Sequence, residues 1–166
     1  IEQIGNQNAI VVEQSGTKEN YVKYVGNGSS NNINISQKAN NNSQTNYTDL
    51  SVTGNYNNVT IKQETTTETN SFGKGAFVNV SGNSNTLTLQ QKNGGSHYAE
   101  VNLSGGNKTV GITQQGSGNH MASVTMSGTP SSLSLTQSGS TQQFYSITNN
   151  CATAGGCAPI TVIQGQ

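Results

Sequence analysis

The chain has 166 residues, a length that suits one domain, and apolar residues make up 30% of it, against about 45–50% in globular domains. Charged residues make up 8% and the net charge is zero, which excludes the clustered cations of nucleic-acid binding and the high net charge typical of disordered chains. No apolar run approaches the roughly 20 residues of a membrane span. The chain is rich in Asn, Gln, Ser, Thr and Gly, a composition typical of polar β-assemblies.

The first predicted strand carries Ile10 and Val12 on one face and ends at Gln14, nine positions after Gly5. The same frame of Gly, aliphatic pair and Gln recurs six more times. The seven glutamines are Gln14, Gln37, Gln63, Gln91, Gln114, Gln137 and Gln164, and the seven glycines are Gly5, Gly28, Gly54, Gly82, Gly105, Gly128 and Gly155. The glutamines are spaced by 23, 26, 28, 23, 23 and 27 residues, and periods of this size indicate a solenoid.

A second alternating run precedes each glycine after the first. These runs begin at Val22, Thr48, Ala76, Ala99, Ala122 and, less regularly, Gln143, and the chain itself opens on the tail of such a run. Period-2 alternation indicates a half-buried strand. Five of the runs begin 15 residues before the next Gln, so length varies only in the other loop. We predict an all-β fold, a single β-solenoid domain over residues 1–166 with about seven strand-turn-strand rungs.

Each repeated Gln lies on the inward face with its aliphatic pair. Six positions before the Gln, on the same face, stand Asn8, Asn31, Asn57, Asn85 and Ser131. An unpaired buried amide costs about 1–3 kcal/mol, whereas amides stacked about 4.8 Å apart can bond to one another in a ladder. We therefore interpret these Gln and Asn residues as structural ladders. Lys108 occupies the Asn position of the fifth rung, which predicts a bulge or a register shift there.

The frame resembles curlin, the major subunit of bacterial curli fibres. The closest match is Gln114-Gln115-Gly116-Ser117-Gly118-Asn119 leading to Ala122, although this segment is one residue longer than the curlin pattern. The second Gln of that pattern is replaced in most rungs, for example by Val52 or Met126, so the resemblance is to a divergent member. It implies a secreted, extracellular subunit on the bacterial surface, an outer-membrane secretion pore and a nucleator as partners, and a role in biofilm matrix and adhesion.

Few residues suggest other chemistry. Cys151 and Cys157 lie in the last rung, where the span from Gln143 to Gln164 is six residues longer than elsewhere, and we predict a disulfide that closes the extra loop in an oxidising setting. His97 and His120 share one register position in adjacent rungs, and we interpret them as solvated loop residues rather than a metal or pH site. No paired-carboxylate or nucleophile motif emerges. We expect no enzyme activity, no cofactor and no metal.

The predicted function is that of a fibre subunit that polymerises with copies of itself head to tail. Both terminal rungs expose an open β-edge, and Val11 and Ile163 place apolar side chains outward where inner rungs are polar. The expected subunit interface comprises Ile1, Gln3, Val11, Ile160, Val162 and Ile163. The chain begins at Ile1 without an initiator Met, as a processed product would, and as trimming would also produce. The alternative is a monomeric β-solenoid: an adhesin, a phage-fibre segment or an ice-binding module.

Overall fold

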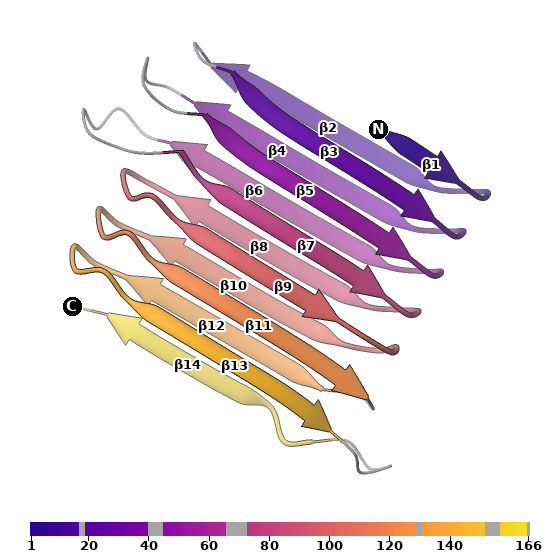
Figure 1. Ribbon diagram of the computed structural model, residues 1–166. Coiled ribbons are helices and arrows are strands. Elements are labelled where there is room, and N and C mark those ends of the chain that lie inside the picture. Colours follow the sequence, from indigo (N-terminus) through magenta and orange to yellow (C-terminus); the bar gives the residue numbers. More distant parts are fainter. Residues whose placement is uncertain (17–18, 40–44, 66–72, 129–130, 152–156, 166) are drawn as a thin grey trace.

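The computed structural model confirms the predicted all-β solenoid (Figure 1). It describes residues 1–16, 19–39, 45–65, 73–128, 131–151 and 157–165. These residues form strands and no helix, and therefore no helix long and apolar enough to cross a membrane. The strands are β1 (Glu2–Ile4), β2 (Ala9–Gly16), β3 (Asn20–Asn27), β4 (Asn32–Ala39), β5 (Asn46–Thr53), β6 (Asn58–Thr65), β7 (Gly75–Ser81), β8 (Thr86–Lys92), β9 (Tyr98–Leu103), β10 (Thr109–Gln115), β11 (Met121–Gly128), β12 (Ser132–Ser138), β13 (Phe144–Cys151) and β14 (Ile160–Gly165).

The strands form two parallel sheets of seven strands each, which face one another across the core (Figure 1). The odd-numbered strands make one sheet, in the order β1 to β13, and the even-numbered strands make the other, in the order β2 to β14. We call them the odd and even sheets, and we call each odd strand with the even strand that follows it a rung. The first rung lies at one end of the stack and the last rung at the other. At each end, one strand of each sheet has a neighbour on its inner side only.

Strand register follows the predicted repeat in the even sheet, where Gln14 pairs with Gln37 and each later Gln with the next. One predicted register is wrong. Tyr145, not Gln143, pairs with Ala122 in the odd sheet. The two registers differ by two residues, so both keep the same face inward and alternation cannot distinguish them. The span from the residue in the Ala122 column to the ladder Gln is therefore 19 residues in the last rung, from Tyr145 to Gln164. It is 15 residues in the five rungs before it.

In the first six rungs a turn that starts at a glycine joins the odd strand to its even strand, and we call this edge of the stack the glycine corner. Its six described glycines, all those predicted except Gly155, which lies outside the described residues, have φ between 74° and 143°. Stacking also needs the missing side chain. A Cβ on Gly28 would lie 1.9 Å from the carbonyl oxygen of Gly54 in the next rung. Only glycine supplies both the left-handed backbone and this close approach.

The core is a thin aliphatic layer between the sheets. In the inner rungs the paired aliphatic residues are fully buried, as Ile33, Ile35 and Leu89 show. The same positions in the two terminal rungs, Ile10 and Val12 in β2 and Ile160 and Val162 in β14, are only partly buried because no further rung covers them. The fold is therefore complete along its sides and open at its two ends.

Candidate functional site

A continuous ladder of glutamine amides runs along the core through all seven rungs. The Nε2 of each Gln donates to the Oε1 of the Gln in the next rung, from Gln14 to Gln37 and onward to Gln164, at 2.7–2.9 Å. The inner members are fully buried. Because every bond points in the same direction along the stack, the ladder has a polarity.

Each inner ladder Gln makes a second bond, across the core to its own rung. The Nε2 of Gln91 also donates to the carbonyl oxygen of Gly75 at 3.0 Å, and the Nε2 of Gln114 donates to that of Tyr98 at 2.9 Å. The acceptor stands 16 residues before the Gln in each case. Sequence reasoning missed this bond between the two sheets. The constant spacing between the start of each second alternating run and the Gln that follows it could have indicated the bond. Both amide hydrogens of each inner Gln are thereby satisfied.

A second ladder of asparagines lines the glycine corner in the first four rungs. The Nδ2 of Asn31 donates to the Oδ1 of Asn8 at 3.1 Å, and Asn57 and Asn85 repeat the bond at 3.0 Å. Each of these three amides also donates to the carbonyl oxygen of a corner glycine. The Asn side chains donate toward the preceding rung, opposite in direction to the Gln ladder. They thus satisfy turn carbonyls that have no strand partner.

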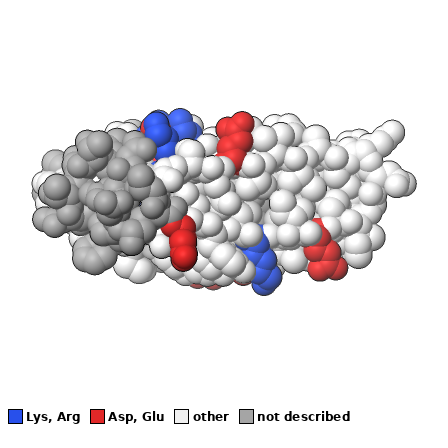
Figure 2. All heavy atoms as spheres, turned by 90° about the horizontal axis from the view of Figure 1, so that it is seen from above, with Lys and Arg blue, Asp and Glu red and all other residues white. Residues whose placement is uncertain are grey.

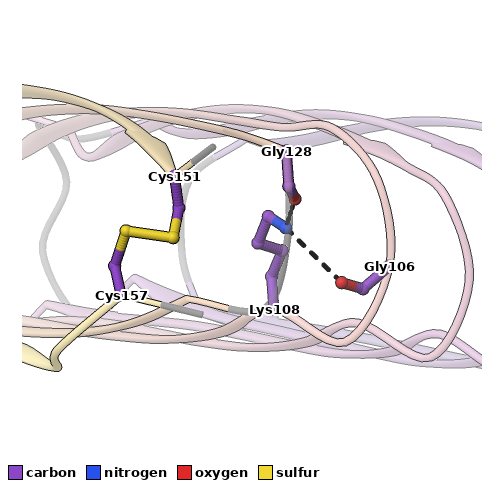
Figure 3. Close-up of a disulfide and its surroundings, with 5 residues drawn as sticks. All are labelled: Gly106, Lys108, Gly128, Cys151 and Cys157. Carbon is purple, nitrogen blue, oxygen red and sulfur yellow. Dashed lines mark hydrogen bonds between the residues drawn. A yellow bond between two sulfur atoms is a disulfide. The ribbon is translucent and has the colours of Figure 1, made fainter. Parts of the chain in front are cut away.

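Lys108 continues the Asn ladder without the predicted bulge, and that prediction is wrong. Its backbone N donates to the Oδ1 of Asn85 at 3.0 Å, as an Asn in this position would. The flanking strand β10 stays in register with β8 and β12. The buried side chain curls into the corner, where Nζ donates to the carbonyl oxygens of Gly106 and Gly128 (Figure 3). Burial lowers the pKa of this ammonium group.

The glycine corner changes again in the last two rungs. Ser131 occupies the ladder position of the sixth rung, and its buried Oγ has no hydrogen-bond partner among the described residues. In the seventh rung a disulfide joins Cys151 to Cys157, with the two Cα atoms 5.7 Å apart. Cys151 pairs with Gly128, so the disulfide lies in the same corner as Lys108, between the two sheets (Figure 3). A covalent bond closes the corner where the Asn ladder has ended.

The opposite edge, where loops of variable length return to the odd sheet, holds a third polar column. We call this edge the loop corner. Its inward column reads Asn20, Asn46, Lys74, His97, His120 and Gln143. Sequence reasoning did not find Lys74, whose buried Nζ donates to the carbonyl oxygen of Asn93 at 2.7 Å.

His97 and His120 are buried, so their interpretation as solvated loop residues is wrong. Their rings stack with centroids 5.1 Å apart and planes 4° from parallel. In each ring Nε2 bonds to the carbonyl oxygen five residues earlier, and Gln143 donates to Ser138 in the same way. Both Nδ1 atoms are buried without a partner among the described residues. Burial is the largest cause that lowers the pKa of His97 to about 3 and also lowers that of His120.

The described residues bring no third ligand to this histidine pair. Within that part of the chain no group of three or more His, Cys, Asp or Glu side chains is placed to hold a metal ion. Since burial lowers both pKa values below 6.5, the two rings are neutral at pH 7 and bond to the carbonyl oxygens of the loop corner in that form.

The two ends of the stack hold the residues expected at the subunit interface. Val11 and Ile163 point outward and are 46% and 77% exposed, and Ile1, at the chain end, is 76% exposed. Gln3 is turned toward the second rung, since its Oε1 accepts the hydroxyl hydrogen of Tyr24 in β3, and its Nε2 donates to the carbonyl oxygen of Ile4 in its own strand. The ladder ends are open: among the described residues the Oε1 of Gln14 accepts no bond and the Nε2 of Gln164 donates none.

Comparison with known proteins gives no relative on which to base a function. No protein-family model, no curated protein and no solved structure matches the chain.

Proposed function

We propose that this protein is the structural subunit of an extracellular amyloid-like fibre that grows head to tail. The observation that carries the proposal is the complementarity of the two open ladder ends. Gln164 ends the ladder with a donor, its Nε2, that lacks an acceptor among the described residues, and Gln14 begins it with an acceptor, its Oε1, that lacks a donor. Stacking the first rung of one subunit on the last rung of another joins this donor to this acceptor and continues the ladder with its polarity unchanged.

The apolar residues of the terminal rungs support the same contact. Ile10, Val12, Ile160 and Val162 are partly buried in the single chain, whereas their inner counterparts are fully buried. Full burial of one Val or Ile side chain contributes about 1.5–3 kcal/mol, so completing it at four positions favours association. Such a contact joins two different surfaces and does not close on itself, so it propagates into an open filament.

The end face offers little protection against such stacking. Figure 2 looks down on the N-terminal end, where Lys, Asp and Glu side chains lie along the rim and the white middle of the face carries none. Soluble β-proteins usually shield an open edge with charges, prolines or a covering helix. Pro159, just before β14, removes one backbone donor near the last rung, and no helix among the described residues covers either end.

We further propose that the subunit is curlin-like and serves biofilm matrix and adhesion, with secretion through an outer-membrane pore and surface nucleation. The support is the resemblance of the repeat to curlin together with the stacked rungs and the Gln ladder. The secretion step is tested separately from polymerisation by expressing the protein in cells that carry a curli secretion system and in cells that lack one. We expect fibres on the surface of the first cells only.

The fibre is tested by blocking one end of the subunit and leaving the other intact. Val162→Asp places a carboxylate at an inward position of the last rung, and Thr161→Asp places it at the outward neighbour as a matched control. We expect wild type and Thr161→Asp to form fibres in electron micrographs, with a repeat of about 4.8 Å along the axis in fibre diffraction. Val162→Asp should remain monomeric with an intact β-sheet spectrum.

The blocked variant should also act as a chain terminator, because its first rung can still dock onto a growing tail. A small fraction of Val162→Asp added to wild type should shorten the fibres, and Thr161→Asp should not. Equal polymerisation of both variants would contradict head-to-tail stacking. Wild-type protein that stays monomeric under all conditions would favour the monomeric adhesin, phage-fibre or ice-binding alternatives.

A further inference from the structure

The outer face of the odd sheet carries a row of aromatic rings along the stack. Tyr21, Tyr47, Phe77 and Tyr98 lie ring against ring, with successive centroids 4.9, 5.1 and 5.5 Å apart. Phe77 belongs to the neighbouring column and leans over Gly75, whose missing side chain makes the space for it. Tyr21 and Phe77 remain 48% and 39% exposed. This face is therefore more apolar than a solvated sheet surface needs to be.

A shallow groove of about 190 Å³ lies beside this row. Phe77 forms one wall, and Asp49 and Glu100 stand in the strands before and after it. The rest of the lining is Ser51, Val78, Asn79 and Asn102. Asp49, Phe77 and Glu100 form one column, so the two carboxylates are two rungs apart, about 10 Å at the usual strand spacing. The groove can thus receive a long side chain with a cationic head at each of two such positions.

The even sheet carries the matching charges on its outer face. Lys38, Glu64 and Lys92 form one column there, so the two lysines are also two rungs apart. Glu64 pairs with Lys62 at 3.3 Å, and on the other face Lys23 pairs with Asp49 at 3.3 Å. Lys38, Lys92 and Glu100 have no ion-pair partner among the described residues.

We infer that the groove of the odd sheet binds Lys38 and Lys92 from the even sheet of a second copy in a neighbouring fibre, so that fibres associate side by side. When Glu64 lies over Phe77, the two lysines lie over Asp49 and Glu100, and this holds whether the fibres run in the same or in opposite directions. The faces of the Phe77 ring are covered by Tyr47 and Tyr98, so its electropositive edge points toward Glu64. The lysine stems pack along the groove while their ammonium groups reach the carboxylates.

The pairing is weak in one subunit and adds up along a fibre. Exposed ion pairs each contribute little, but every subunit of a fibre repeats the same two pairs, and the contacts act together once the first has formed. The inference therefore rests on the proposed fibre: a free monomer would not show it.

The test uses fibres grown separately and then incubated in low salt, with fibre width measured by electron microscopy and bundling by light scattering. Lys38→Glu with Lys92→Glu, and independently Asp49→Lys with Glu100→Lys, should each reduce the paired fraction at least about fivefold, because like charges then meet along the whole fibre. The variant that carries all four changes has no net charge and should pair again. Glu13→Lys with Glu19→Lys changes the net charge as much as the second variant but lies outside these columns, and it should still pair.

Salt provides a test that needs no variant. Wild-type pairs should separate as the screening length falls from about 30 Å at 0.01 M salt to about 3 Å at 1 M. Wild-type fibres that stay single at low salt, or face variants that pair as wild type does, would overturn the lateral pairing and leave the fibre proposal intact. Absence of fibres would overturn both.

Discussion

The glutamine ladder and the glycine corner line the same core, yet one is uniform and the other changes along the stack. Gln occupies its position in all seven rungs, whereas the corner holds Asn in the first four rungs, then Lys108, Ser131 and a disulfide. Each inner Gln must meet three demands at once, one from each neighbouring rung and one from the strand opposite. The corner mainly asks for a donor to a turn carbonyl, which several side chains can supply. A position therefore keeps the same residue type in every rung when its side chain must make several hydrogen bonds at once, and burial alone does not impose this.

The largest effect should come from breaking the uniform ladder. Gln91→Leu leaves one amide hydrogen of Gln63 and the Oε1 of Gln114 unpaired in the core, and it removes the cross-sheet donor to the carbonyl of Gly75. At about 1–3 kcal/mol for each of these two unpaired groups, we expect about 2–6 kcal/mol less stability in urea unfolding and slower assembly. Gln90→Leu, the outward neighbour, should change stability by less than about 0.5 kcal/mol. Equal unfolding and assembly of the two variants would contradict the ladder.

Acid should destabilise the loop corner next. His97 has an ordinary pKa of 6.5 and a pKa of about 3 in the folded chain, so folding excludes the proton. The stability it contributes is complete above pH 6.5 and is lost as pH falls from 6.5 toward 3, by as much as about 5 kcal/mol in total.

The matched variant replaces both rings by the residue found earlier in the same column. His97→Asn with His120→Asn should lose less stability than wild type between pH 6.5 and pH 4 in thermal melting at stepped pH. Parallel loss in both proteins would assign the acid sensitivity to other groups.

Removing the disulfide should have a smaller effect, confined to the last rung. Cys151 and Cys157 close a short loop, and opening it should cost about 2 kcal/mol. We expect mass spectrometry without reductant to find the two joined within one chain, and Cys151→Ser with Cys157→Ser to lower the urea midpoint. Hydrogen exchange should rise in β13 and β14 but not in β3 to β8. Free thiols in natively isolated protein would contradict the bond.

Restoring asparagine to the fifth rung should give the smallest change, and in the opposite direction. Lys108→Asn removes a buried ammonium group and can extend the Asn ladder, so we expect a gain of about 1 kcal/mol. Because burial lowers the pKa of Lys108 below 10.5, the advantage of the variant should shrink as pH rises toward 10.5. Lys108→Met, which removes the charge but not the bulk, should leave the carbonyl of Gly128 unpaired and show no gain.

The repeat itself predicted the fold and the composition of the ladders, because a period that recurs seven times outweighs local ambiguity. It did not predict what single rungs do. Lys108 stands where other rungs carry Asn or Ser, which predicted a bulge or a register shift, but its Nζ reaches two turn carbonyls and the register holds. Tyr145 rather than Gln143 continues the Ala122 column since a two-residue slip preserves the inward face.

The sequence by itself determined which residues face inward, where the six described glycine turns fall and which residues of the even sheet stack on one another, because in a parallel stack a repeat position in sequence is also a position in space. Only the tertiary structure decided the partners that come from outside the repeat. The cross-sheet bond of each inner Gln, the burial of His97 and His120 and the curl of Lys108 depend on how closely the two sheets approach at their corners. That distance is set by the packing of all rungs together and is not encoded in any single period.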